Sequence, residues 1–316
     1  MDKNQHLGII LGLSTGFSFG TIGVISALLR NLNVSSFEQL SLRLIFTAFL
    51  AGNILVFVYF NQQQLFFQTL EWKFLRVFII QGVLVLLMSF FFVTAVALNI
   101  PVAEGSLLIQ IHPIFTLILA YFTLGEQITA KKVTAIGLAI FGVVLLLNPF
   151  DWSSFLSSFA GNMFAMLTGF TFAFYIIISR LTSADRVDIP QYLSLAWIFL
   201  FSSLFLPFFR ILLTLLFSTE AIVKFDVISL LNAEILGLGF LLAIFGTITP
   251  YSCAFVATKF IQSSEISLLA LSEPFVAAIL GFVILQEQLR LLGVAGGFLL
   301  LLAIIILQRS MNEAST

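Results

Sequence analysis

The sequence is short of charged side chains. Only 9% of its 316 residues are Asp, Glu, Lys or Arg, whereas soluble domains usually carry about 25%. Hydrophobic residues make up 60% of the chain, and the mean hydropathy is +1.13. A water-soluble protein with so little charge could not cover its own surface. The scarcity therefore excludes a soluble domain and indicates a chain surrounded by lipid.

Other features of known chemistry are also missing. The net charge of −1 gives no electrostatic reason to expect a nucleic-acid partner. The single cysteine, Cys253, cannot form a disulfide within the chain. There are only two histidines, no group of His, Asp and Glu with metal-ligand spacing, and no Walker motif. We therefore expect no enzyme, no metal and no cofactor. Energy would come from an ion or solute gradient, or the protein is a facilitator, and the sequence leaves this choice open.

What the sequence does contain is a series of long apolar runs. A helix needs roughly 20 residues to cross the hydrocarbon core of a bilayer. By this length criterion the sequence predicts an all-α bundle of ten transmembrane helices. The expected spans are residues 7–29, 37–60, 74–98, 102–124, 131–148, 160–180, 190–216, 233–257, 262–285 and 290–308.

Ten spans place both termini on the same side of the membrane. Nine of the Lys and Arg residues that flank the spans fall on the side of the N-terminus, and five fall on the other. Because positive residues accumulate on the cytoplasmic side, we expect both termini in the cytoplasm. The first apolar run has no Ala-x-Ala cleavage pattern, so we expect it to be a retained span rather than a signal peptide.

The chain also contains an internal repeat. Residues 104–127 align without a gap to residues 265–288 at an offset of 161, and ten of the 24 aligned positions are identical. A second match, residues 15–19 with 168–172, has an offset of 153. Apolar helices share Leu and Phe by chance, but the shared Glu, Ser, Pro and Glu-Gln residues indicate a true duplication. We expect the two repeats to occupy residues 7–148 and 160–308.

The number of spans in each repeat determines how the repeats are related. Five is odd, so two five-span repeats in one chain must lie in opposite orientations across the membrane. Inverted repeats of this kind are common in alternating-access transporters, whose substrate site lies near the midplane between the repeats. We therefore expect a polar pocket halfway through the bilayer.

Several of the repeated residues resemble a known family. Pro113, the link Leu124-Gly125-Glu126-Gln127, the pair Glu273-Pro274 and the link Gln286-Glu287-Gln288 are similar to the EamA-type transporters of the drug/metabolite transporter superfamily. The resemblance spans both halves and implies a 5+5 inverted bundle that moves amino acids, metabolites or toxic small molecules. Arg43 resembles an arginine that many members carry in span two. Phe19-Gly20 departs from the Trp-Gly often found in the family, which leaves the substrate class more open.

Ionisable residues inside spans are costly, so each is a candidate for the site. His112 and Glu273 are repeat partners at the same expected depth, and each directly precedes a proline. A proline removes the helical donor of the carbonyl four residues earlier, here Ile109 and Ala270. A histidine changes its charge near neutral pH, and carboxyl groups in apolar surroundings can do the same. The two could form a protonation-coupled pair near the pseudo-two-fold axis, or could simply join helices.

The remaining candidates have stronger structural alternatives. Glu104 and Glu265 could act in gating or coupling, although a first-turn carboxylate also stabilises a helix N-terminus. Arg43 could attract an anion or could extend its side chain to the membrane surface. Gln110, Tyr175 and Trp197 could face the pocket, although aromatic residues more often pack or contact lipid. Glu126 and Glu287 are expected to cap or brace helices.

These observations predict a transporter that moves an amino acid or similar organic solute across the cytoplasmic membrane by alternating access, as an exporter or exchanger. Its expected partners are that solute, the lipid bilayer and, as an open alternative, protons. The competing functions are a solute-sensing receptor and a channel. The sequence leaves the substrate, the direction of transport and the oligomeric state open.

Overall fold

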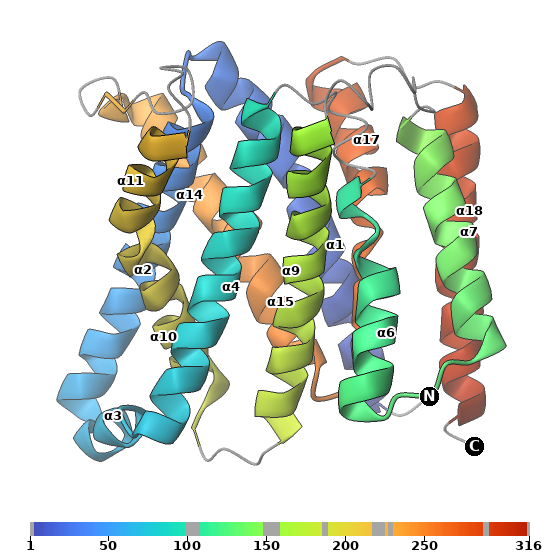
Figure 1. Ribbon diagram of the computed structural model, residues 1–316, viewed down its shortest axis with the longest axis horizontal. Helices are drawn as coiled ribbons and strands as arrows, with labels where there is room; N and C mark the ends of the chain where they lie inside the picture. Colours follow the sequence, from blue (N-terminus) through green and yellow to red (C-terminus); the bar gives the residue numbers. More distant parts are fainter. Residues whose placement is uncertain are drawn as a thin grey trace.

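A computed structural model describes residues 3–98, 108–147, 159–184, 189–216, 225–226, 230–286 and 291–314. Every regular element in these ranges is a helix, which confirms the predicted all-α class. The helices stand side by side, and both chain ends lie at the same end of the bundle (Figure 1). We call this end the terminal side.

The described helices fall into two groups in chain order. The elements of the first half are α1 (Lys3–Asn31), α2 (Ser36–Asn61), α3 (Gln63–Thr69), α4 (Trp72–Ala97), α6 (His112–Leu124) and α7 (Ala130–Leu147). Those of the second half are α9 (Phe159–Ala184), α10 (Gln191–Leu204), α11 (Leu206–Leu216), α14 (Ala233–Ala243), the π-helical turn η1 (Ile244–Ile248), α15 (Thr249–Ala257), α16 (Ser263–Ala270), α17 (Glu273–Ile284) and α18 (Leu291–Ala314).

The outer surface of the bundle is apolar. In the described part of the chain, seven helical segments are long and apolar enough to cross a membrane, and two shorter apolar helices accompany them. Large side chains such as Phe49, Phe57 and Phe122 are more than 60% exposed. Such a surface is stable only in contact with lipid. The chain is a multi-pass membrane protein, and the count of ten spans stays a prediction.

The two halves are interlocked rather than placed side by side. α1 packs mainly on α15, α16 and α17 of the second half, and α9 packs mainly on α4 and α6 of the first. Gly8 near the start of α1 and Arg180 near the end of α9 both contact Ile261. The first helices of the two halves therefore run in opposite directions, as an inverted repeat requires. α7 and α18 form a pair at one side (Figure 1).

Proline residues divide three of the expected spans. α16 ends at Ala270 and α17 starts at Glu273, so span nine is two helices rather than the single kinked helix we expected. In span four, a turn at Gln110 and Ile111 precedes α6. Span seven is interrupted at Phe205, two residues before Pro207. A proline cannot donate a helical hydrogen bond, and each break lies just before one.

Two elements were not expected from the sequence. The short helix α3 lies between spans two and three, where Phe66 packs against Trp197 of α10. In span eight, which was expected to be one continuous helix, α14 passes through η1 into α15. Pro250 has no N–H for the carbonyl of Gly246 four residues earlier, and the wider π-helical turn stands at this position.

Candidate functional site

The broken helices of the two halves meet through a mirrored pair of contacts. Pro113 and Pro274 remove the helical donors of the Ile109 and Ala270 carbonyls. Each of these oxygens faces a glycine in the first helix of the other half. A Cβ atom placed on Gly169 would lie 2.5 Å from the Ile109 oxygen, and one on Gly16 would lie 2.6 Å from the Ala270 oxygen. Glycine is therefore required at both places.

His112 is buried at the junction of spans four and nine. Its Nδ1 lies 2.6 Å from the hydroxyl of Ser267, which also lies 2.9 Å from the hydroxyl of Thr116. The ring packs edge-on against Phe172, with the centroids 5.0 Å apart. His112 is only 2% exposed. The imidazole joins the two repeats through a buried hydroxyl, which matches the helix-joining alternative for this residue.

Glu273 stands at the start of α17 and is half-buried. The side chain of Gln110, at the break before α6, lies beside its carboxylate. Gln110 is 2% exposed, and its Oε1 atom has no hydrogen-bond partner among the residues that the structure describes. A buried amide oxygen without a partner is costly and rare in folded proteins. These two residues therefore form a polar locus that the protein's own contacts leave incomplete.

Arg43 points into the bundle and not toward the membrane surface. Its Nε donates to the hydroxyl of Thr247, and its Nη2 donates to the carbonyl of Gly246. The second acceptor is the carbonyl that Pro250 leaves without a helical donor. Among the residues that the structure describes, no Asp or Glu lies within ion-pair distance of Arg43. A guanidinium that is 8% exposed thus stands without a carboxylate partner in that part of the chain.

Tyr251 lies between the two charged groups. It is close enough to both Arg43 and Glu273 to interact with them electrostatically. Its hydroxyl donates to the sulfur of Met88 at 2.8 Å, and its carbonyl accepts from the hydroxyl of Tyr175 at 2.9 Å. The tyrosine therefore connects a buried cation to a half-buried carboxylate near the middle of the bundle. We call Arg43, Tyr251, Glu273 and Gln110 the midplane cluster.

Aromatic rings fill the centre beside this cluster. Phe19 and Phe172, which are repeat partners, meet edge to face at 5.5 Å, and Phe19 meets Tyr251 at the same distance. Tyr175 and Tyr251 are 5.0 Å apart. The open polar pocket that we expected between the repeats is therefore absent from the described part of the structure, because the first helices of both halves place Phe side chains there. The structure represents a closed arrangement.

The predicted pairing of His112 with Glu273 is not observed. No hydrogen bond joins these two described residues, because His112 contacts Ser267 and Glu273 lies beside Gln110. Trp197 is also distant from the cluster: its indole N–H donates to the hydroxyl of Thr69 at 2.8 Å, which ties α10 to the end of α3. Glu104 lies outside the described residues.

Glu265 has a structural position at the start of α16. One of its carboxylate oxygens accepts from the backbone N–H of Gln262 at 2.9 Å, which forms a capping box. Glu126 contacts the same helix start, in keeping with the expectation that it caps or braces helices. Its carboxylate accepts from the N–H groups of Ser263 and Ser264 at 2.7 and 3.3 Å. Both acids stabilise a helix N-terminus.

Sequence reasoning missed Tyr251, Thr247 and Ser267. The first two flank Pro250 inside a span, which is the same signal that identified His112 and Glu273. A search for polar residues within a few positions of every intramembrane proline would have found them. Ser267 was noted only as a repeated residue, and its role depends on a contact with His112 at a separation of 155 residues.

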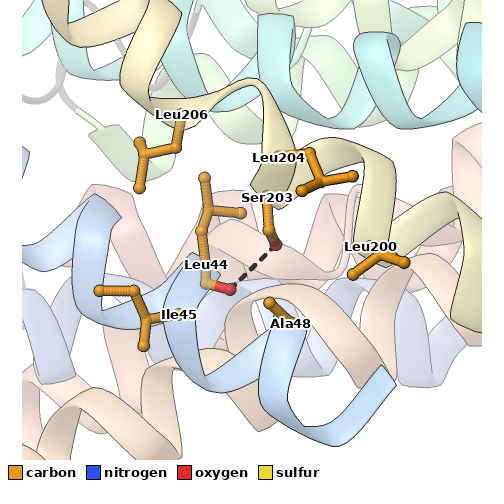
Figure 2. A pocket seen from close by; sticks show the side chains of 7 residues that line it. All are labelled: Leu44, Ile45, Ala48, Leu200, Ser203, Leu204 and Leu206. Carbon is orange, nitrogen blue, oxygen red and sulfur yellow. Dashed lines mark hydrogen bonds between the residues drawn. The ribbon is translucent and has the colours of Figure 1, made fainter. Parts of the chain in front are cut away.

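A separate crevice of about 180 Å³ lies between α2 and α10. Figure 2 shows its walls, which include Leu44, Ile45 and Leu204, with the Ser203 hydroxyl donating to the carbonyl of Leu44 at 2.9 Å. Ile45 and Leu204 are more than half exposed on the apolar surface. The crevice is thus a lipid-facing feature at the break in span seven, and it is not connected with the charged groups.

Comparisons with known proteins agree with this arrangement. The chain is 26% identical over 208 residues to an "Uncharacterized transporter" of Archaeoglobus fulgidus, which covers 66% of this chain and 67% of that protein. It is 38% identical over 58 residues to a "Probable amino-acid metabolite efflux pump" of Escherichia coli, which covers 18% of this chain and 19% of the pump.

A solved crystal structure has the same fold, with a TM-score of 0.72 at 16% identity over 98% of this chain and 99% of the other. The chain matches the EamA-like transporter family twice, over residues 6–148 and over residues 159–309. Two matches in tandem agree with the duplication that the sequence indicates. On this evidence the chain is a membrane transporter and belongs to the EamA-like transporter family.

Proposed function

We propose that this protein is a secondary carrier that moves a small organic solute, an amino acid or a similar molecule, across the cytoplasmic membrane by alternating access. The observation that carries this proposal is the midplane cluster. Arg43 and Glu273 carry opposite charges, and Tyr251 lies near enough to each of them to interact with it electrostatically. They lie where spans four, eight and nine are all interrupted.

The physical argument concerns the cost of buried charge. An ionised group in a low-dielectric interior is stable only when it is paired or hydrogen-bonded. Arg43 has two neutral acceptors, and Glu273 has a neutral amide beside it. A solute with a carboxylate and an amino group would pair with both residues at once. The Escherichia coli relative is named as a probable amino-acid metabolite efflux pump, which supports a solute of this class.

Energy for transport would come from a gradient of the solute or of an ion, with protons as one alternative. We place both termini in the cytoplasm on the basis of the positive residues that flank the spans. The name of the Escherichia coli relative, an efflux pump, supports an exporter or exchanger as the mode of action. The closed centre fits a cycle in which the solute site opens to one side at a time.

The experiment has two steps. A thermal-shift screen on purified protein first identifies a solute, because a ligand that binds the folded state raises its apparent stability. Counterflow in proteoliposomes then tests transport: preloading the vesicles with that solute accelerates uptake of labelled solute if the site alternates. R43Q and E273Q should abolish this acceleration, whereas E71Q, which removes an exposed carboxylate, should retain it.

Two outcomes would contradict the proposal. Uptake that preloading does not accelerate would identify a channel. Binding without any flux would identify a receptor. Retained counterflow in both R43Q and E273Q would show that carriage occurs but that the midplane cluster is not the solute site.

A further inference from the structure

The terminal side of the bundle is held together by a network that crosses between the repeats. Glu126 follows α6 of the first half, and it binds the start of α16 in the second. Its carboxylate accepts from the N–H of Ser263 at 2.7 Å and from the hydroxyl of Ser264 at 2.6 Å. An acid from one repeat therefore caps a helix of the other, and the capping box of Glu265 completes the same helix start.

Lys132 strengthens this junction. Its ammonium group donates to the Ser264 hydroxyl at 3.0 Å and to the side-chain oxygen of Gln262, and it lies 3.8 Å from Glu126. Lys132 and Glu126 are 6% and 8% exposed. Charge-assisted bonds in such surroundings are stronger than those at an exposed surface. If α6 and α16 separate on this side, the charges of Glu126 and Lys132 are exposed or lose their partners.

The repeat allows a comparison with the opposite side from the sequence alone. At the offset of 161, Glu126 corresponds to Glu287, so both sides keep the acid. The partners differ. Gln262 and Ser264 correspond to Pro101 and Ala103, while Lys132 falls opposite the apolar stretch Leu291–Val294, with Arg290 as the nearest basic residue. The aligned positions, whose side chains lie outside what the structure describes, therefore carry no counterpart of the Ser264 hydroxyl, the Gln262 amide or the lysine.

We infer that Glu126 and Lys132 are gating residues that hold the terminal side closed and bias the resting carrier to open toward the opposite side. The inference rests on the proposed alternating access, in which the two sides open in turn. In an inverted repeat the two states would be equivalent if both closing junctions were alike. The richer junction on one side removes this equivalence and sets which side faces the solute first.

A distance measurement between two labels tests the gate directly. Spin labels are placed on cysteines at Ile128 and Lys259, which are exposed residues on either side of the junction, in a C253A background. The labelled protein that carries no further substitution, in liposomes, should show one narrow distribution of short distances between the two labels. E126Q and K132M should each add a longer distance, because losing a charge-assisted bond shifts such an equilibrium roughly tenfold to a hundredfold. E71Q, an acid-to-amide change at an exposed position, should leave the distance unchanged.

S264A provides a milder version that removes only one hydroxyl. It should lengthen the distance in a smaller fraction of molecules, and it guards against a folding defect in the charge variants. Identical distances in E126Q, K132M, S264A and E71Q, in protein that unfolds at an unchanged temperature, would overturn the gate. A shifted distance in a protein that shows no counterflow would instead retain the gate and reject the carrier function.

Discussion

Spans three and eight are counterparts in the two repeats, yet they differ in form. Span three is the unbroken helix α4, whereas span eight is divided into α14, η1 and α15. The divided helix is the one that supplies Gly246 and Thr247 to Arg43. In contrast, the contact of a proline-freed carbonyl with a glycine of the other half occurs in both halves, at Ile109 with Gly169 and at Ala270 with Gly16. The duplication therefore preserves the contacts that hold the bundle, and it diverges where a charge is bound.

Among the variants that test this difference between the halves, substitution of Arg43 is expected to have the largest effect on transport and stability. R43Q removes the charge that we assign to the solute and also leaves the Gly246 carbonyl without its donor. We expect transport to be lost and the protein to be destabilised by about 1–3 kcal/mol, the cost of a buried unsatisfied group. Counterflow and thermal unfolding measure the two effects separately.

R43K is the matched variant for this prediction. It keeps the charge but cannot hold two acceptors with the planar fork of arginine. It should therefore recover part of the stability and little of the transport. Full transport by R43Q would mean that the divided span eight has no role in binding the solute.

A smaller and symmetric effect is expected at the two glycines. G16A and G169A each place a methyl group within 2.6 Å of a carbonyl oxygen of the other half. Overpacking of this kind should destabilise each variant by about 1–3 kcal/mol, and by similar amounts if the junction is truly mirrored.

Gly23, on the same helix as Gly16, has no neighbour within 4 Å of an added Cβ atom, so G23A is the matched control. It should not destabilise the protein and can stabilise it slightly, because alanine favours a helix more than glycine does. Thermal unfolding in detergent provides the measurement. A large effect in only one of G16A and G169A would show that the junction is not equivalent in the two halves.

The smallest effect is expected for His112. Its imidazole is tied to Ser267, whereas Glu273 is half-buried and has only an amide beside it. We therefore expect that H112Q retains the pH profile of transport, while E273Q shows no counterflow at any pH because it lacks the carboxylate that we assign to the solute. Initial rates of counterflow between pH 5 and 9 make this test. A flattened profile in H112Q would restore the protonation-coupled pair that the sequence suggests.

The free carbonyls in spans four and nine could be predicted because their cause is local, although the full break of span nine into two helices was not expected. Pro113 and Pro274 lack an N–H wherever they stand in a helix, and the carbonyls that they leave free lie a fixed four residues earlier. The duplication could be predicted for a similar reason, since aligned polar residues are visible in one dimension. The opposite orientation of the two repeats followed from the odd number of spans in each.

The site itself could be predicted only in part. Arg43 and Glu273 were found by their cost in a membrane, but Arg43 binds a residue 204 positions away, and no local pattern indicates that pairing. Tyr251 acquires its position from the packing of α15 against α1 and α9. The sequence makes Trp197 a candidate for the pocket only because of its span, with packing as the alternative. Its partner, Thr69, belongs to a short helix that the sequence did not reveal.

The interlocked packing of α1 and α9 has a consequence for how the protein is made. α1 is synthesised before α15, α16 and α17, which are its main neighbours and lie in the second half of the chain, so α1 stays without these contacts until they have been inserted into the membrane. Neither half is then a folding unit by itself. A gene cut between the repeats would yield two fragments that are stable only when they are produced together.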